Sequence, residues 1–499
     1  MTDATDSSDL AALAAEAYVY GYPLVHNLTM VDRITRRGTG SVAPAEFNEF
    51  VHFSRLAGPD DDFVSVGNDT LYSTAQLDLS GGPLLLHVPD YGGEYYVLQF
   101  VDAWSNNFAY LGSRATGTAE CRWLITPPGW SGSAPEGVRI VDAPTAVVSV
   151  VGRSACAGPD DVPRVAALQR ELTLTPALPR TLGFSPELSA SPPSSRLPRA
   201  LGSARAGGTP MSRGGSHGQG GPPWAGGTSM GRGAGLPTPD PAVPEQLRFF
   251  EELRVWMADF PPPPPDSAYQ DRFQPLGLLE EGPSPYAGAD PALVRALEAG
   301  LAAGRERVEI ASEPPPHESP AGAWEMDLHL FDYNLDRLGP GTLDEARWKI
   351  ADRRESYLVR AATALTALWG CHAYEAVQAC TFTDAEGKQL NGAHSYTLRF
   401  EEPPPVDAFW SLTMYDTPDH FLVDNPAGRY SIGDRTPGLV RADDGSLTLV
   451  LQHERPKDPV EAANWLPAPA GDFRPMIRLY QPREPVLRGD YRLPRVVRR

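Results

Sequence analysis

The sequence predicts a mainly β fold with helical segments (α+β), built from two antiparallel β-sandwich or jelly-roll-like domains with helices at the N-terminus and in the centre. Three observations support this prediction. The chain has 499 residues, which is too many for one hydrophobic core. It contains 47 glycines and 52 prolines, which disfavours a helical bundle and favours short strands joined by turns. Such strands and turns recur in two separate stretches of the chain.

Residues 1–40 are predicted to form an N-terminal helix. Leu10, Leu13 and Ala17 recur at helical spacing, and the pattern resumes after Pro23 and stops at Gly38. Because proline removes a backbone donor and clashes with the preceding turn, we expect a kink at Pro23.

Residues 41–176 are predicted to form the first β domain. Short runs rich in β-forming residues alternate there with turns that contain glycine and proline, and no helical pattern intervenes. This organisation is typical of an antiparallel sandwich or a jelly roll. The predicted strands are Leu84–Val88, Tyr95–Val101, Cys121–Ile125 and Ala146–Val151.

Residues 177–240 form an insert that is rich in glycine, proline and arginine, although the rest of the chain is acidic. Such a segment cannot bury enough apolar surface to offset its chain entropy, so we expect disorder. One explanation is that the segment is a flexible linker. The other is that a GC-rich gene is translated here in a shifted reading frame. The shifted frame is favoured because the flanking residues Leu168–Pro176 and Leu236–Leu247 have the composition of ordinary folded sequence.

Residues 241–380 are predicted to form a helical connecting region. Its first helix has an apolar face and ends at the proline run Pro261–Pro265. Asp290, followed by a proline, is a predicted N-cap for a second helix that runs to Ser312. Thr342 and Glu345 match a capping box that predicts the start of a third helix, which ends at Gly370.

Residues 381–499 are predicted to form a second β-sandwich domain. Tyr396–Phe400 alternates between apolar and polar residues, and Phe409–Met414 is a second β-rich run. Leu447–Gln452 follows a turn at Asp443–Ser446.

The charge of the chain excludes some classes of partner. It carries 43 basic and 63 acidic residues, for a net charge of −20, which argues against a nucleic-acid partner. The N-terminus is acidic and no apolar run is long enough to span a bilayer, so we expect a cytoplasmic protein with no membrane partner.

The four cysteines are expected to be thiols, and no two histidines share a metal-ligand spacing, so no metal site is predicted. No phosphate-binding or dinucleotide-binding motif occurs, and the cofactor is unknown.

Two polar clusters in the first β domain are candidate ligand contacts. Asn68, Asp69 and Tyr72 favour a turn that leads into a strand, and an Asx turn with a packed tyrosine is the alternative explanation. The second cluster ends a predicted strand and combines a carboxylate and two amides with aromatic residues, as polar ligand pockets do. Amides that satisfy loop backbone would produce the same residues. The members of this second cluster are Asp102, Trp104, Asn106 and Asn107.

A third cluster lies in the second β domain. Along a strand, Ser411, Thr413 and Tyr415 face one way, whereas Trp410, Leu412 and Met414 face the other. The three hydroxyls are predicted either to line a cavity or to form a solvated face. Tyr430 and Arg429 follow, and Arg429 is a candidate clamp for a carboxylate or phosphate, with an internal ion pair to Asp416 or Asp434 as the alternative.

Long motifs in both halves of the chain resemble a known family. The N-terminal half contains AYVYGYPLV (Ala17–Val25), NDTLYSTAQLDLSGGP (Asn68–Pro83) and YYVLQFVDAWSNNFAYLGSRATG (Tyr95–Gly117). The C-terminal half contains FWSLTMYD (Phe409–Asp416), NPAGRYSIGDR (Asn425–Arg435), NWLPAP (Asn464–Pro469) and RLYQP (Arg478–Pro482). With these motifs the chain resembles the bacterial proteins that pair the domains of unknown function 1254 and 1214. The resemblance implies two β-sandwich domains with helical elements, and it implies no catalytic residue.

Two functional hypotheses follow. The first is an enzyme that acts on a small polar or amphipathic molecule at the interface of the two β domains, with Asp102 as general base and Tyr415 as proton donor, while Arg429 fixes an anionic group. The second is a non-catalytic ligand-binding or assembly module, in which tryptophans and tyrosines at loop ends stack on sugars or join subunits of a homo-oligomer. The first is favoured because the polar clusters lie in different domains, and ligand sites often form at domain interfaces.

Overall fold

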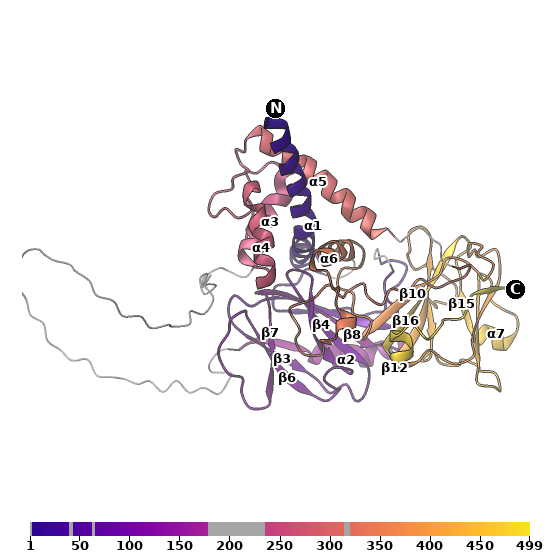
Figure 1. Cartoon of the computed structure of the whole chain (residues 1–499). Coiled ribbons are helices and arrows are strands. Elements are labelled where there is room, and N and C mark those ends of the chain that lie inside the picture. The colour runs from indigo at the N-terminus through magenta and orange to yellow at the C-terminus, as the bar shows by residue number, and fades with distance from the viewer. Residues whose placement is uncertain (1, 39–42, 62–64, 178–234, 314–319) are drawn as a thin grey trace, which may run out of the picture.

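The computed structural model describes residues 2–38, 43–61, 65–177, 235–313 and 320–499. Two β domains lie side by side, and a group of helices lies over the first of them (Figure 1). The N-terminus is at the far tip of this helical group, and the C-terminus is in the second β domain (Figure 1). The described residues form 17 strands and eight α-helices, so the predicted mainly β fold with helical segments is confirmed.

The helical group combines two parts of the chain that the first β domain separates in sequence. Its longest member, α1 (Thr2–Arg37), contains Pro23 and runs against α5 (Pro291–Ser312), α6 (Arg353–Ala367) and α3 (Arg248–Asp259). Their apolar faces share one core with residues at the ends of interior strands of the first β domain, including Ala103, Trp104 and Val147. The group is therefore anchored on the first β domain through this core. The shorter helix α4 (Ser267–Gln270) belongs to the same group, whereas α2 (Val162–Glu171) packs on the first β domain.

The first β domain consists of two sheets that share a hydrophobic core, as in a sandwich. The larger sheet has the order β1-β2-β8-β4-β5, and the smaller has the order β7-β6-β3-β9. All pairs are antiparallel except β6 with β7. The strands are β1 (Phe50–His52), β2 (Thr70–Asp78), β3 (Leu84–Val88), β4 (Tyr96–Asp102), β5 (Asn107–Gly112), β6 (Cys121–Thr126), β7 (Val138–Asp142), β8 (Val147–Ala155) and β9 (Thr173–Pro176).

The second β domain is also a pair of sheets around one core. One sheet has the order β10-β16-β12-β13 and the other β15-β14-β11-β17. Two short helices, α7 (Pro459–Ala463) and α8 (Glu484–Leu487), lie between its strands in sequence. The strands are β10 (Ala376–Cys380), β11 (Tyr396–Phe400), β12 (Val406–Asp416), β13 (Ser431–Gly433), β14 (Leu447–Gln452), β15 (Trp465–Pro467), β16 (Phe473–Pro482) and β17 (Val497–Arg498).

One predicted helix start is wrong. The helix expected to begin at the capping box of Thr342 begins instead at Arg353, where the Asp352 carboxylate accepts the backbone N–H of Arg354 at 2.7 Å. The Thr342 hydroxyl donates to the carbonyl of Gly339, and Glu345 forms an ion pair with Arg347, so neither residue of the box caps a helix. The predicted Asp290 cap, in contrast, accepts the backbone N–H of Ala292.

Most of the predicted insert at 177–240 lies outside the described residues. Its last residues lie within them and are packed: Gly235 donates its backbone N–H to Asp78, and the carbonyl of Pro237 accepts the Trp256 indole. The domain divisions proposed from the sequence otherwise stay predictions.

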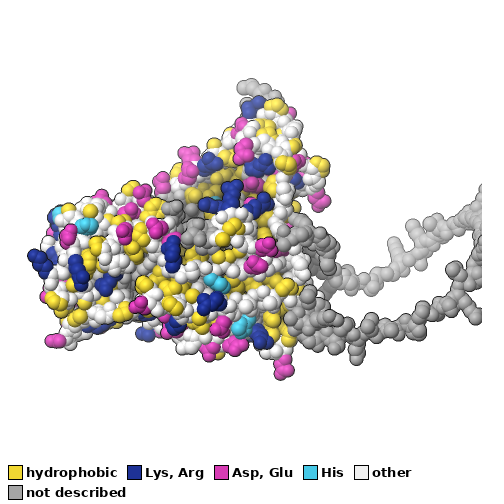
Figure 2. All heavy atoms as spheres, turned by 180° about the vertical axis from the view of Figure 1, so that it is seen from behind, with side chains coloured by type: hydrophobic (Ala, Val, Ile, Leu, Met, Phe, Trp, Pro, Cys, Tyr) yellow, Lys and Arg dark blue, Asp and Glu magenta, His cyan; other side chains and the backbone are white. Residues whose placement is uncertain are grey.

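The rear surface carries basic and acidic side chains interspersed, with one small group of basic side chains at the base of the helical projection (Figure 2). This face therefore lacks the continuous basic stripe typical of nucleic-acid binders. None of the helices in the described ranges has the length and apolar character needed to cross a bilayer.

Candidate functional site

The predicted alternation along β12 is confirmed and places its polar face between the two β domains. In the register of β12 with β16, Ser411 pairs with Arg478 and Tyr415 pairs with Arg474, so these side chains share one face. Trp410, Leu412 and Met414 lie on the other face and are buried. The hydroxyl face is therefore neither solvated nor exposed, because it packs against the first β domain. We call this buried polar contact between the domains the domain junction.

Asp69 is the carboxylate that links the two domains at the junction. It lies just before β2 and is only 4% exposed. Its two carboxylate oxygens accept hydrogen bonds from the hydroxyls of Ser411 and Tyr480, the latter at 2.8 Å. Its neighbour Asn68 contacts the second domain as well, through the hydroxyl of Ser431. Two clusters that are far apart in the sequence thus meet.

Arg478 and Tyr415 form the centre of the junction. The Arg478 guanidinium donates to the hydroxyls of Thr413 at 3.1 Å and Tyr415 at 2.9 Å, and to the Ser65 carbonyl at 2.6 Å. The Tyr415 hydroxyl donates its proton to the carbonyl of Val66. Burial raises the pKa of Tyr415, and the nearby Arg478 only partly opposes this shift. Tyr415 is therefore neutral, and its only proton is already used within the fold.

Arg474, the next arginine on this face of β16, is paired less completely. It is 8% exposed, and its guanidinium donates to the Ser65 hydroxyl and contacts the Cys380 sulfur at 3.8 Å. Its Nε has no hydrogen-bond partner among the described residues, and no carboxylate there forms an ion pair with it. Burial lowers its pKa, because no counter-charge compensates for the lost solvent.

A second group of charges, a buried carboxylate with two partly buried arginines, lies where the helical region meets the same junction. Arg114 forms an ion pair with Glu375 at 2.6 Å, and the hydroxyl of Tyr95 donates to the same carboxylate. Arg153 donates to Gln99 at 2.8 Å and lies over the ring of Tyr72, whose ring centroid is 5.6 Å from its guanidinium carbon. Tyr72 therefore contacts a cation rather than only apolar atoms.

Asp102 lies in a closed turn at the end of β4. One carboxylate oxygen accepts the backbone N–H groups of Trp104 and Asn106, both at 2.9 Å, and the other accepts the Asn106 amide. Asn107 donates to the carbonyl of Gly370, and the Trp104 indole donates to the carbonyl of Phe260. Burial raises the pKa of Asp102, although the Asn106 and Trp104 hydrogen bonds oppose it. Each of these groups satisfies backbone or a neighbouring side chain.

The structure does not bring Asp102 and Tyr415 together. Asp102 pairs across the sheet with Val148 on β8, whereas Thr70, next to Asp69, pairs with Ala155 at the opposite end of β8. Seven residues of strand separate these ends, which is about 23 Å at the usual rise per residue. A general base and a proton donor so far apart cannot act on one bond. The proposed catalytic pair therefore has no support in the geometry.

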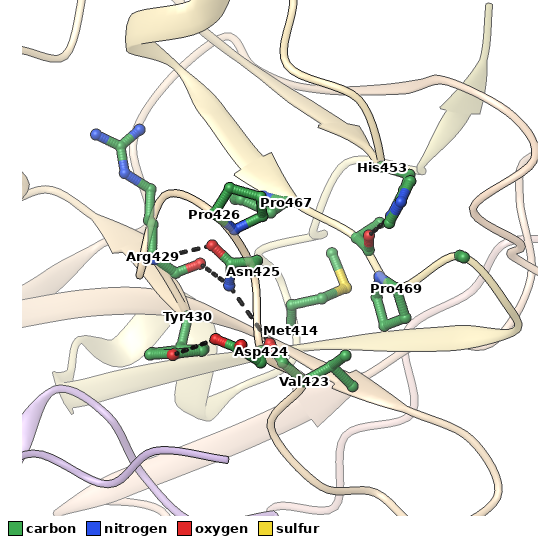
Figure 3. A pocket seen from close by; sticks show the side chains of 12 residues that line it. Met414, Val423, Asp424, Asn425, Pro426, Arg429, Tyr430, His453, Pro467 and Pro469 are labelled. Carbon is green, nitrogen blue, oxygen red and sulfur yellow. Dashed lines mark hydrogen bonds between the residues drawn. The ribbon is translucent and has the colours of Figure 1, made fainter.

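Arg429 and Tyr430 lie away from the junction, beside a pocket of about 180 Å³ in the second β domain. The Arg429 guanidinium donates to the carbonyls of Ala463 and Trp465, so neither predicted ion pair, with Asp416 or Asp434, forms. In Figure 3 this guanidinium points away from the pocket. The Trp410 indole faces the core of the second sandwich, where it packs on Phe400.

The junction residues that sequence reasoning missed are Arg153, Glu375, Arg474, Arg478 and Tyr480. A signal for three of them is visible in the sequence: Arg474, Arg478 and Tyr480 recur at even spacing along one run, so they share one face of a strand. Nothing local marks Arg153 or Glu375, whose partners are far away in the chain.

The comparisons with known proteins agree with this two-domain organisation. Residues 47–176 match the family described as "Protein of unknown function (DUF1254)", and residues 375–484 match "Protein of unknown function (DUF1214)". The predicted resemblance is thereby confirmed. No curated protein matches the chain.

Two solved structures are similar to the chain. The VPA0106 protein from Vibrio parahaemolyticus has a TM-score of 0.66 and 21% identity, and the alignment covers 98% of this chain and 100% of that one. This likeness supports the fold. A putative uncharacterized protein from Burkholderia cenocepacia has a TM-score of 0.40 and 10% identity, with 99% and 95% of the two chains covered. A TM-score this low establishes no common fold.

Proposed function

We propose that this chain, which pairs a DUF1254 domain with a DUF1214 domain, binds a small anionic molecule at the domain junction. The observation that carries the proposal is the guanidinium of Arg474, which is buried and whose Nε has no partner among the described residues. A buried charge without a counter-charge costs several kcal/mol. A bound carboxylate or phosphate group would remove this cost with charge-assisted hydrogen bonds.

The balance of buried charge at the junction supports an anionic ligand. Arg114 and Arg153 both lie near the carboxylate of Glu375, and Arg478 lies near that of Asp69. Arg474 pairs with neither carboxylate. Counted over the described residues, the junction thus holds more positive than negative charge, although the chain as a whole has a net charge of −20. An acidic protein that concentrates buried and partly buried arginines in one place favours anions there over its remaining surface.

Aromatic rings stabilise Arg474 only in part. Its guanidinium carbon is 5.7 Å from the ring centroid of Phe382 and 5.8 Å from that of Tyr415. Cation–π contacts of this kind contribute about 0.5–2 kcal/mol, which is less than the cost of burying an unpaired guanidinium. An anion therefore gives a better account of Arg474 than the rings alone.

Binding is better supported than catalysis. Asp102 is about 23 Å from the junction by strand length, and the Tyr415 proton is held by the Val66 carbonyl. The three hydroxyls of the junction donate to, or accept from, groups of the protein itself. The hydroxyls of Thr413 and Tyr415 position the guanidinium of Arg478, and none of the three hydroxyls is poised as a free acid or base.

The test is thermal unfolding of the full chain with inorganic phosphate or succinate, each compared with chloride at equal ionic strength. Anion binding stabilises the folded state by mass action and therefore raises Tm. The free energy of unfolding increases by about 2.7 kcal/mol when the ligand is at 100 times its Kd. We expect Arg474→Met to abolish this rise. Arg483→Met is the matched control, because Arg483 is exposed and pairs with Asp407 at the surface. Equal anion responses of wild type and Arg474→Met, or no response of the wild type to either anion, would refute the proposal.

A further inference from the structure

The pocket of the second β domain has features that differ from those of the junction. Its walls are mostly apolar. They come from the segment that contains Asn425, from the segment that contains Pro467, and from Met414 near the end of β12. The Met414 thioether points into the middle of the pocket, and Pro469 and His453 lie on one side of it (Figure 3). Asp424 and Tyr430 lie on the opposite side and face each other (Figure 3). The pocket is therefore an apolar space with polar groups at its margins.

Its size limits what it can hold. The cavity measures about 180 Å³, and a cavity of about 150 Å³ in another protein holds a molecule of benzene. The space therefore fits a compact molecule of about six to eight non-hydrogen atoms. Apolar walls of this kind gain free energy by removing the body of such a molecule from water.

The polar side of the pocket is negative. The Asp424 carboxylate is exposed, has no basic partner among the described residues, and is 3.5 Å from the Tyr430 hydroxyl. Burial raises the pKa of Tyr430, and the charges of Asp424 and Asp60 raise it further, so a second carboxylate adds to the negative potential. The guanidinium of Arg429 points away and binds two backbone carbonyls. No cation among the described residues therefore neutralises Asp424 from within the pocket.

His453 adds an acceptor on the opposite side. Its Nδ1 is 3.0 Å from the carbonyl of Ala468. A carbonyl can only accept, so Nδ1 donates in this contact, and Nε2 is the ring nitrogen left to accept from a ligand. Asp424 on one side of the pocket and His453 on the other thus both favour a ligand with a hydrogen-bond donor over one with an acceptor.

We propose that this pocket binds a small organic cation, a primary amine on a compact apolar body, with its ammonium group at Asp424 and its body against Met414 and the prolines. The ring of Tyr430 lies beside the expected position of the ammonium group, where a cation–π contact would add to the ion pair. The site is separate from the anion site proposed for the junction, and each can fail without the other.

The experiment compares three molecules of nearly equal shape: benzylamine, benzyl alcohol and benzoate. At pH 7.5 they are a cation, a neutral molecule and an anion. Binding to the full chain is followed by NMR through the methyl resonance of Met414, which is assigned with Met414→Leu, so that a ligand bound at the junction is not counted. We expect benzylamine to bind at least tenfold more tightly than benzyl alcohol, and benzoate not to shift the resonance.

Two variants locate the interaction. Asp424→Asn keeps the shape of the side chain and is expected to reduce benzylamine affinity to that of benzyl alcohol. Asp419→Asn is the matched control, since Asp419 is exposed on the same loop and does not line the pocket. Ala468→Leu would fill the cavity and is expected to abolish the binding of all three molecules. Equal affinities for the three molecules, no shift with benzylamine, or full benzylamine affinity in Asp424→Asn would each overturn the proposal.

Discussion

Asp69 and Asp102 lie at opposite ends of the same sheet, and both carboxylates are buried. Within the described part of the chain, the Asp102 carboxylate accepts hydrogen bonds only from residues two and four positions further along. Asp69 accepts hydrogen bonds from Ser411 and Tyr480, more than 300 residues away. The first carboxylate closes a local turn, whereas the second joins two domains.

This difference shows that the residue type does not reveal the role of a buried carboxylate. Each cluster has the same composition, a carboxylate beside an amide and an aromatic residue. The two roles differ only in how far along the chain the hydrogen-bond donors of the carboxylate lie. Nearby donors close a turn, and distant donors make an interdomain contact. The two carboxylates should therefore differ in what their removal does to the coupling between the domains.

Removal of Asp69 should have the largest effect. Asp69→Ala leaves the hydroxyls of Ser411 and Tyr480 without an acceptor and leaves Arg478 without its nearby carboxylate. We expect a loss of about 3–5 kcal/mol, as for other broken buried charge contacts. Calorimetry should show one unfolding transition dividing into two, because the domains lose their main polar contact. Asp407→Ala, which breaks only an exposed ion pair with Arg483, serves as the control. A single transition in Asp69→Ala would contradict this role.

Labelling of Cys371 should report opening of the junction directly. This thiol is 9% exposed, lies 3.5 Å from Arg153, and has its pKa raised to about 11 by burial. It should react with a maleimide only when the junction opens. A loss of about 3 kcal/mol in Asp69→Ala corresponds to labelling about a hundredfold faster. Mass spectrometry of the Cys371 peptide measures this rate, and Asp102→Asn should leave it unchanged; equal acceleration by both variants would mean that the two ends are coupled.

Asp102→Asn should have a smaller effect, of about 2 kcal/mol. The new amide group would face the Asn106 amide, which now donates to Asp102, while the backbone N–H groups of Trp104 and Asn106 can keep one oxygen acceptor. Urea denaturation should show this loss in a single transition. A second transition in this variant would show that the turn also holds the domains together.

The cost of Asp102→Asn should depend on pH. Burial raises the pKa of Asp102 in the folded state, so the folded protein binds a proton here more readily than the unfolded chain. Stability from this group is therefore greatest below the usual aspartate pKa, near 4, and falls as the pH rises through the raised value. We expect the variant to lose more stability at pH 4.5 than at pH 7. Urea denaturation at both pH values tests this, and the opposite order would exclude a raised pKa.

Ser431→Ala should have the smallest effect. The Ser431 hydroxyl donates to Asn68 at 3.1 Å on the partly exposed rim of the junction. Loss of one such hydrogen bond costs about 1 kcal/mol or less. Urea denaturation should show this loss without division of the transition. A loss comparable to that of Asp69→Ala would place the main contact at the rim instead of at Asp69.

The sequence predicted features that depend on local periodicity. The alternation that places Ser411, Thr413 and Tyr415 on one face follows from the two-residue repeat of a strand, and the Asp290 cap follows from the geometry of a helix start. The capping box at Thr342 failed because its chain segment pairs with β5, where the carbonyl of Pro340 accepts the backbone N–H of Tyr110. A contact with a distant strand prevailed over a local preference there.

The candidate site itself was only half predictable. Both sets of junction residues could be singled out, but nothing local shows that Asp69 meets Ser411 instead of Asp102 meeting Tyr415. That choice is made by strand register, which depends on the packing of whole sheets. The cationic character of the site could not be predicted either. Arg474 and Arg478 lie in β16, whereas the predicted hydroxyl face lies in β12.

The position of α1 has a consequence for synthesis of the chain on the ribosome. This helix is made well before its partner helices, because its apolar face packs against α3, α5 and α6, which lie more than 200 residues further along the chain. Translation proceeds at about 5–20 residues per second, so α1 leaves the ribosome at least about ten seconds before its first partner helix. During this interval its apolar face has only the growing chain, a chaperone or water to contact. Nascent α1 is therefore a segment for which chaperone capture is expected.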